Sequence, residues 1–207
     1  MQVGDVRVAG ALTAELVLDA YRRGIFPMGQ PGTSRVDWYA PDPRAVLPLD
    51  GFRVPRSLRR VCRSGRFEVV SDRDFDAVID GCAQRPSTWI SPAIRKAYVA
   101  LHREGHAHSV EAYERGVLAG GLYGVRAGAA FMGESMFHRR TDASKVALVG
   151  LVALLRRQGF TLLDIQFMTP LLAGFGAREI PRAEYGRLLA TALKSAPKWI
   201  SGPLTLE

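Results

Sequence analysis

The sequence predicts an α+β protein with a mostly antiparallel sheet that gains one parallel strand late in the chain. Two observations predict it. Between residues 106 and 137, three segments of alternating or continuous apolar residues are separated by short turns, which is typical of an antiparallel meander. Residues 131–166 then read as a strand, about four turns of apolar helix and a second strand, the order of a crossover unit. With 207 residues and 47% apolar content, the chain can bury a sizeable core.

The first part of the chain predicts short helices. Residues 14–23 place apolar residues on one helical face after the capping residue Thr13, and Gly24 ends this helix. Three prolines within residues 38–50 disfavour a helix and allow only an edge strand or extended chain. The next expected elements are a basic helix at 54–63, a short strand at 67–71, and helices at 74–81 and 92–104.

The second part predicts most of the sheet. The expected elements are strands at 106–113, 117–125 and 129–137, a helix capped by Thr141 or Asp142 and ended by Gly159, a strand at 160–166, and a last helix that includes 188–193. This order is found in the acetyltransferase-like (GNAT-type) fold. We therefore predict a small N-terminal α/β domain with the basic helix at residues 1–88, and an acetyltransferase-like catalytic domain at residues 89–207.

The turn before the crossover helix argues against a coenzyme A site. The acetyltransferase-like fold usually holds the pyrophosphate of acyl-coenzyme A on a Gly-rich turn, where free amides at the helix N-terminus attract anions. Here residues 138–142 contain no glycine, and Asp142 would repel a pyrophosphate. The sequence therefore predicts a different acyl donor, or none.

Charge and cysteine content narrow the class of protein. Lys and Arg total 28 against 20 acids, a net charge of +8, which favours an anionic partner without proving one. Two isolated cysteines fit a reducing compartment. The N-terminus lacks the pattern of a signal peptide, and the longest apolar run, residues 146–155, is shorter than the roughly 20 residues that span a bilayer. We expect a soluble cytoplasmic protein without a membrane partner.

Three polar residues stand out within apolar strands. Asp164 and Gln166 lie two apart at the end of a strand and therefore share one face. Glu134 lies in an apolar segment as well. Buried polar groups are costly without partners, so this arrangement indicates a site. Glu134 could equally bind an amine or form a salt bridge in the core.

Other candidates have two interpretations each. Arg56, Arg60 and Arg63 form a cationic stripe without intervening acids, which fits phosphate binding or a solvated helix face. Trp89 could stack on a base or pack in the core. His102, His106 and His108 lack the cysteines or acids that would complete a zinc site, so we predict no metal. We also predict no cofactor. Ser135 lacks the glycine that a nucleophile elbow requires two residues later.

An ordered set of motifs resembles the leucyl/phenylalanyl-tRNA–protein transferase family. No single motif is decisive, but together they run in family order from about residue 16 to residue 193. The matching pieces are AYRRGIFPM (20–28), WYAPDPRAVLPLD (38–50), TWI (88–90), AYVALHREGHAHSVEAY (97–113), GGLYG (120–124), FMGESMF (131–137), DASK (142–145), LLDIQ (162–166) and FGAREIPR (175–182).

The resemblance implies roles for individual residues. Its catalytic relay pair falls on Asp164 and Gln166, where we hypothesise that Asp164 polarises Gln166 and that the amide oxygen orients the attacking amine. Its pocket acid falls on Glu134. Its tRNA-binding helix carries Arg56, Arg60 and Arg63. The remaining substrate-binding positions are Leu122, Phe131, Gly133, Met136, Ile165, the adenosine-packing Trp89, and Met28, where many members have Trp.

The same resemblance implies a function. A family member transfers Leu, Phe or Met from aminoacyl-tRNA to the α-amine of a protein that begins with Arg or Lys, which marks it for degradation by the N-degron pathway. We expect a monomer. Two alternatives are a coenzyme A–dependent N-acetyltransferase and a non-catalytic tRNA-binding relative.

Overall fold

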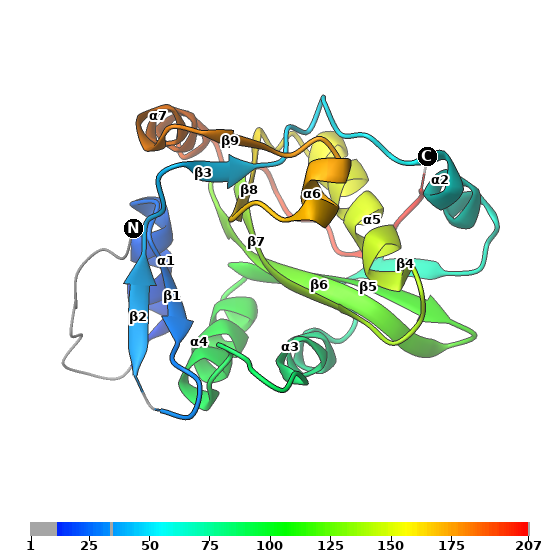
Figure 1. Ribbon diagram of the computed structural model, residues 1–207, viewed down its shortest axis with the longest axis horizontal. Coiled ribbons are helices and arrows are strands. Elements are labelled where there is room, and N and C mark those ends of the chain that lie inside the picture. Colours follow the sequence, from blue (N-terminus) through cyan, green and yellow to red (C-terminus); the bar gives the residue numbers. More distant parts are fainter. Residues whose placement is uncertain (1–11, 34, 207) are drawn as a thin grey trace.

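The computed structural model describes residues 12–33 and 35–206 (Figure 1). The first eleven residues, on which the expectation of no signal peptide rests, lie outside the described part. The helices are α1 (Ala14–Arg22), α2 (Arg56–Arg63), α3 (Phe75–Ala83), α4 (Pro92–Arg103), α5 (Ala143–Arg157), α6 (Pro170–Gly174) and α7 (Arg182–Ala192). The strands are β1 (Phe26–Gly29), β2 (Val36–Tyr39), β3 (Arg44–Val46), β4 (Glu68–Ser71), β5 (Ala107–Glu114), β6 (Val117–Ala127), β7 (Ala130–His138), β8 (Leu162–Gln166), β9 (Arg178–Ile180) and β10 (Gly202–Pro203).

An eight-stranded mixed sheet organises the molecule, in the order β10-β4-β5-β6-β7-β8-β3-β9. The meander β5–β6–β7 is antiparallel, as the apolar alternation predicts. Helix α5 then crosses over to β8, which pairs with β7 in parallel. The predicted crossover unit is therefore confirmed.

Helices cover both faces of the sheet, so there are two apolar cores. One core packs α1, α3 and α4 against one face, and the other packs α2 and α5 against the opposite face (Figure 1). Helix α5 is buried along most of its length, which explains why its sequence is apolar on nearly every side. None of the helices described is both long and apolar enough to cross a bilayer.

Strand β3 departs from the prediction for the proline-rich segment. We expected an edge strand or extended chain, but β3 lies inside the sheet and pairs with both β8 and β9. Only Arg44, Ala45 and Val46 form this strand, between Pro43 and Pro48, so neither proline has to donate a hydrogen bond within it. The prediction was wrong because the proline content limits how long a strand can be, but it does not determine where in the sheet that strand lies.

The N-terminal part shares the sheet with the C-terminal part. Strands β3 and β4, which precede residue 88, pair with β8 and β5, which follow it. The predicted division at residues 88 and 89 falls between α3 and α4. It remains a prediction about domain organisation, but the sheet spans that point.

Candidate active site

The candidate site lies where β7 and β8 separate. The parallel pairing runs from Ala130 opposite Leu162 to Met132 opposite Asp164 and continues no further. Beyond it, the second half of β7 and the end of β8 leave an opening between neighbouring strands. Ligands commonly bind where strands diverge in this way, because backbone and side chains become accessible inside the sheet.

A β-bulge places Glu134 at this opening. In the β6–β7 ladder Gly124 pairs with Gly133 and Tyr123 pairs with Ser135, so Glu134 is the extra residue without a partner. A bulge locally twists a strand and redirects its side chain. Gly124 permits this geometry, because a Cβ there would lie 2.3 Å from the carbonyl oxygen of Met132.

Asp164 lies beneath the opening, fully buried in a charged cluster. Its carboxylate accepts hydrogen bonds from Arg44 Nε (2.9 Å) and Nη2 (2.6 Å) and from the Tyr185 hydroxyl (2.8 Å). The Arg44 guanidinium is also buried, and it lies over the rings of Phe26 and Tyr185 at 4.7 and 4.6 Å. Although burial opposes its charge, Asp164 raises the pKa of Arg44 above its ordinary value. The two charges therefore stabilise each other inside the protein.

Asp164 fixes the backbone of Gln166 rather than its side chain. The Asp164 Oδ1 atom accepts a hydrogen bond from the backbone N–H of Gln166 at 2.9 Å. Gln166 has a φ of 57°, a left-handed conformation that is uncommon for residues other than glycine. The contact between the two residues thus runs through the main chain of Gln166, and the expectation that Asp164 polarises the amide stays a prediction.

The side chain of Gln166 contacts Glu134 instead. Its Nε2 donates to Glu134 Oε1 at 2.9 Å, and the Tyr98 hydroxyl donates to Glu134 Oε2 at 3.0 Å. The Tyr98 hydroxyl is also hydrogen-bonded to that of Tyr21. Burial raises the pKa of Glu134 to about 7, although the two tyrosine hydroxyls act in the opposite direction. Its buried position therefore favours the neutral form of Glu134 more than solvent would.

A mostly apolar pocket of about 460 Å³ opens beside this pair. Glu134 and Gln166 form its polar wall, and Leu148, Leu151 and Leu163 contribute apolar surface. Phe167 and Leu171, at 44% and 40% exposure, line it as well. Exposed large apolar side chains around a concave site are typical of a binding site for an apolar group.

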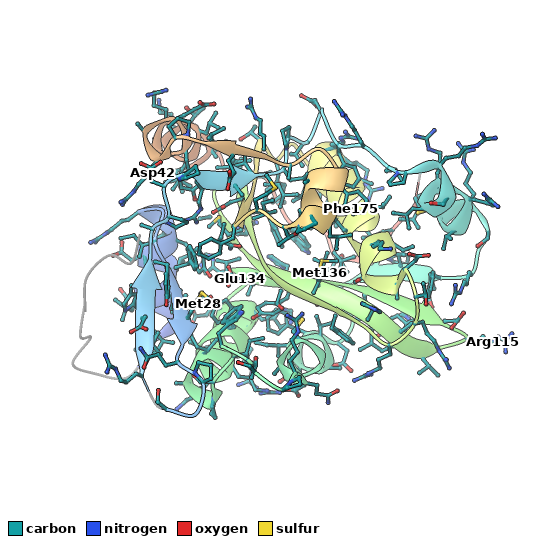
Figure 2. The ribbon with its side chains drawn as sticks, in the orientation of Figure 1. Met28, Asp42, Arg115, Glu134, Met136 and Phe175 are labelled. Carbon is teal, nitrogen blue, oxygen red and sulfur yellow. The ribbon has the colours of Figure 1, made fainter. Side chains whose placement is uncertain are left out.

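The structure brings most of the predicted site residues together. Those that line the pocket are Trp89, Leu122, Gly133, Glu134, Met136, Ile165 and Gln166. Phe131 lies outside that lining, because it is fully buried and stacks on Trp199 with ring centroids 5.4 Å apart. Met28, on β1, also lies outside it. Figure 2 labels Met28, which lies on β1, and Glu134 and Met136, which both lie on β7.

Sequence reasoning missed the partners of these residues. Arg44 reads as one more basic residue in a proline-rich segment, and Tyr21 and Tyr98 read as apolar positions of two helices. The available signal was weak: a tyrosine on a buried helical face usually finds a hydrogen-bond partner. Arg85 was also missed; it lines the pocket and donates a hydrogen bond to the carbonyl oxygen of Met136.

The cationic helix is exposed, as its composition predicts. In α2, Arg56, Arg60 and Arg63 lie on the surface while Leu58 packs into the core. These three arginines form no ion pair with an acid among residues 12–33 and 35–206. Figure 2 shows nitrogen-tipped side chains spreading outward around α2.

Comparison with known proteins decides the family. The sequence profile described as leucyl/phenylalanyl-tRNA protein transferase matches residues 46–190, and the profile of the N-terminal domain of the same family matches residues 10–42. The chain belongs to the leucyl/phenylalanyl-tRNA–protein transferase family. The match includes every predicted site residue, since all of them lie between residues 28 and 166.

Relatives in the leucyl/phenylalanyl-tRNA–protein transferase family are similar over most of their length. The transferase named from Rubrobacter xylanophilus is 58% identical over 184 residues, 88% of this chain and 96% of that protein. The transferase from Ruegeria pomeroyi is 55% identical, over 90% of this chain and 89% of that protein. The transferase from Rhodopseudomonas palustris is 51% identical, over 97% of this chain and 91% of that protein.

Among solved structures, L-PGS from Bacillus licheniformis is similar with a TM-score of 0.41 and 13% identity. The match covers 89% of this chain and 62% of the L-PGS chain. A likeness of this size carries no functional argument.

Proposed function

We propose that this protein transfers Leu, Phe or Met from aminoacyl-tRNA to the N-terminal α-amine of proteins that begin with Arg or Lys. One observation carries the proposal: a carboxyl group with a pKa near 7 and a glutamine amide lie together on the wall of an apolar pocket. Family membership supports the donor and the reaction. The preference for Arg or Lys rests on the resemblance, as do the cytoplasmic location and the monomeric state.

The apolar pocket suits the side chain of the transferred residue. Leu122, Met136 and Ile165 line it, and each buried methylene stabilises a bound ligand by about 0.8 kcal/mol. Met136 adds a flexible thioether that adapts to different shapes. Such a surface favours Leu, Phe and Met over Ala or any polar residue.

Gln166 and Glu134 suit the incoming amine. The amide nitrogen of Gln166 is bound to Glu134, so its oxygen remains to accept a hydrogen bond from the amine. We propose that Glu134 takes the proton that the amine loses, since an α-ammonium has a pKa of roughly 7.7–8.0, close to that of this carboxyl group.

The transfer forms one bond and breaks one. The amine nitrogen forms a bond to the ester carbonyl carbon, the bond from that carbon to the 3′ oxygen of the tRNA breaks, and the proton passes through Glu134 to the departing oxygen. The ester is already activated, so positioning supplies much of the acceleration.

We further propose that the fold is of the acetyltransferase type without a coenzyme A site. The meander, the crossover helix α5 and the separation of β7 from β8 support the fold. In the turn before α5, the backbone N–H groups of Arg139 and Arg140 both donate to the carbonyl oxygen of Ala119, at 2.6 and 3.1 Å. They are therefore occupied and do not offer the free amides that a pyrophosphate needs.

Transfer to a peptide tests the function directly. The protein is incubated with leucyl-tRNA and an Arg-starting peptide, and the peptide mass is measured. We expect an increase of one leucyl residue, with seryl-tRNA and acetyl-coenzyme A as matched donors that give none. No mass change with leucyl-tRNA, or acetylation by acetyl-coenzyme A, would overturn the proposal.

A further inference from the structure

A second group of arginines surrounds a hollow near the β5–β6 turn, away from the apolar pocket. The hollow has a volume of about 550 Å³. Four arginines line it, together with one acid and a short apolar floor: Arg66, Arg115, Arg139, Arg140, Glu114 and residues 117–119. We call these four arginines the turn cluster.

The charge of the turn cluster is only partly compensated. Arg66 Nε donates to Glu114 Oε1 at 2.7 Å, and Arg140 Nε lies 3.5 Å from Glu114 Oε2. One carboxylate thus faces two guanidinium groups. Arg115 and Arg139 form no ion pair within residues 12–33 and 35–206, and Arg139 lies over the ring of Phe137. The hollow therefore presents an excess of positive charge to solvent.

Arg115 occupies a position that an arginine does not favour. It has a φ of 52° and Gly116 has a φ of 77°, which is the left-handed pair of a two-residue hairpin turn. Asn, Asp or Gly is preferred at the first of these positions, and a longer side chain is strained there. Arg115 interacts electrostatically with Glu114, which Arg66 and Arg140 also contact, and Figure 2 shows Arg115 at the outermost tip of the hairpin. A strained, exposed arginine that shares its neighbouring acid with two other arginines keeps charge available for an external anion.

The turn cluster continues the surface of α2. Arg66 follows Arg63, the last residue of α2, by three positions, and its bond to Glu114 ties it to the β5–β6 turn. Figure 1 shows α2 and this turn at the same end of the molecule. An elongated anion that contacts α2 would therefore reach the turn cluster without leaving the surface.

We infer that the turn cluster is a second phosphate-binding surface for the body of the donor tRNA, in addition to α2. The inference rests on the proposed function. Guanidinium groups pair bidentately with phosphates, and the residues that line the hollow include no aromatic side chain on which a base could stack. The surface would therefore contact the RNA backbone independently of base sequence.

Salt-dependent binding tests this surface. The double variant Arg115→Ala/Arg139→Ala is compared with Arg56→Ala/Arg60→Ala on α2 and with Arg103→Ala/Arg187→Ala, which removes two exposed charges elsewhere. Kd for leucyl-tRNA is measured across a salt series. We expect the first two variants to lose roughly two units of slope, about one per contact, and the third to match the wild type. An Arg115/Arg139 variant with the wild-type slope and Kd would overturn the inference.

A truncated donor separates this inference from the proposed function. Leucyl-adenosine carries the ester but no tRNA body, so the Arg115→Ala/Arg139→Ala variant should use it as fast as the wild type does. If the wild type transfers from neither donor, the proposed function fails. If it transfers from both and the variant is slower only with tRNA at low concentration, the inference holds. Slower transfer from leucyl-adenosine as well would show that the residues act elsewhere, and would also overturn it.

Discussion

Two networks of buried polar side chains lie on this sheet, and they differ in whether their polar groups face a pocket. In the active-site network, Arg44 binds Asp164, and Asp164 holds Gln166, which donates to Glu134. That chain of contacts ends at a pocket. Glu134 is only partly enclosed by protein, and burial has raised its pKa to about 7.

In the distal network the buried polar groups pair with one another, and Ser201 lies at its exposed end. His108 lies in it with Nδ1 2.8 Å from Asp72 and Nε2 3.2 Å from the carbonyl oxygen of Gly105. Ser201 donates to Asp72 at 2.7 Å, and the ring of Trp199 stacks on that of His108 with centroids 4.2 Å apart. Although burial opposes its charge, His108 lowers the pKa of Asp72.

The comparison shows why burial alone does not identify a site. His102 and His108 come close to Asp72, within 4.8 Å, and that grouping resembles a metal site. Yet His102 Nδ1 is bound to the carbonyl oxygen of Ala107 at 2.8 Å, and both nitrogens of His108 face oxygen atoms. These contacts join β5 to the segment after residue 198. The active-site network instead leaves an amide oxygen and an ionisable carboxyl group facing a cavity, and this is what indicates chemistry.

The strongest test of this difference is Asp164→Ala. It leaves Arg44 buried without its carboxylate, so we expect a loss of about 3–5 kcal/mol in the free energy of unfolding. Transfer should nearly vanish, since Gln166 loses the contact that holds its backbone. Urea unfolding and single-turnover rates measure both. The Gln166→Ala variant, measured in parallel, leaves the Arg44–Asp164 ion pair intact. It keeps the test decisive if Asp164→Ala does not fold. Near-normal rates in both would mean that the network is purely structural.

The pH dependence of stability in the Glu134→Gln variant tests the same comparison. The folded pKa of about 7 lies above the ordinary value of 4.5, so the native state binds this proton more tightly than the unfolded state does. The wild type should therefore lose stability as the pH rises from about 4.5 to 7, by about 1–3 kcal/mol after allowance for its partial exposure. The variant should lack that loss and be the more stable at pH 8.

Transfer measured over the same pH range gives the second readout for Glu134. If the carboxylate accepts the proton, the wild-type rate should rise with a midpoint near pH 7, whereas the Glu134→Gln variant should be slow and rise only as the α-amine itself deprotonates, at roughly pH 7.7–8.0. A variant with the wild-type rate and pH profile would exclude Glu134 from the proton transfer.

Asp72→Asn should have the smallest effect and should spare transfer. The folded pKa of Asp72 is lowered, so its contribution to stability is present above the unfolded value of about 3.9 and is lost as the pH falls below it. We expect a destabilisation of about 1–2 kcal/mol at pH 7 that shrinks toward pH 3. Single-turnover transfer at low temperature should equal that of the wild type. A specific loss of rate in a folded variant would show that the distal network also serves the reaction.

Much of the molecule follows from local sequence. Apolar alternation after residue 106 determined the meander, and the apolar stretch of residues 146–155 determined the crossover helix, because side-chain periodicity depends only on neighbours along the chain. Glu134, Asp164 and Gln166 stood out for the same reason, as polar residues inside apolar strands.

Only the tertiary structure decided how those residues are partnered. Arg44 meets Asp164 across 120 positions of sequence, and Tyr98 meets Glu134 across 36. The bulge that presents Glu134 depends on the register of β6 against β7, which a single strand does not encode. The free energy of a buried charge depends on which groups surround it in space, so local patterns showed that these side chains needed partners, and the packing of distant segments chose them.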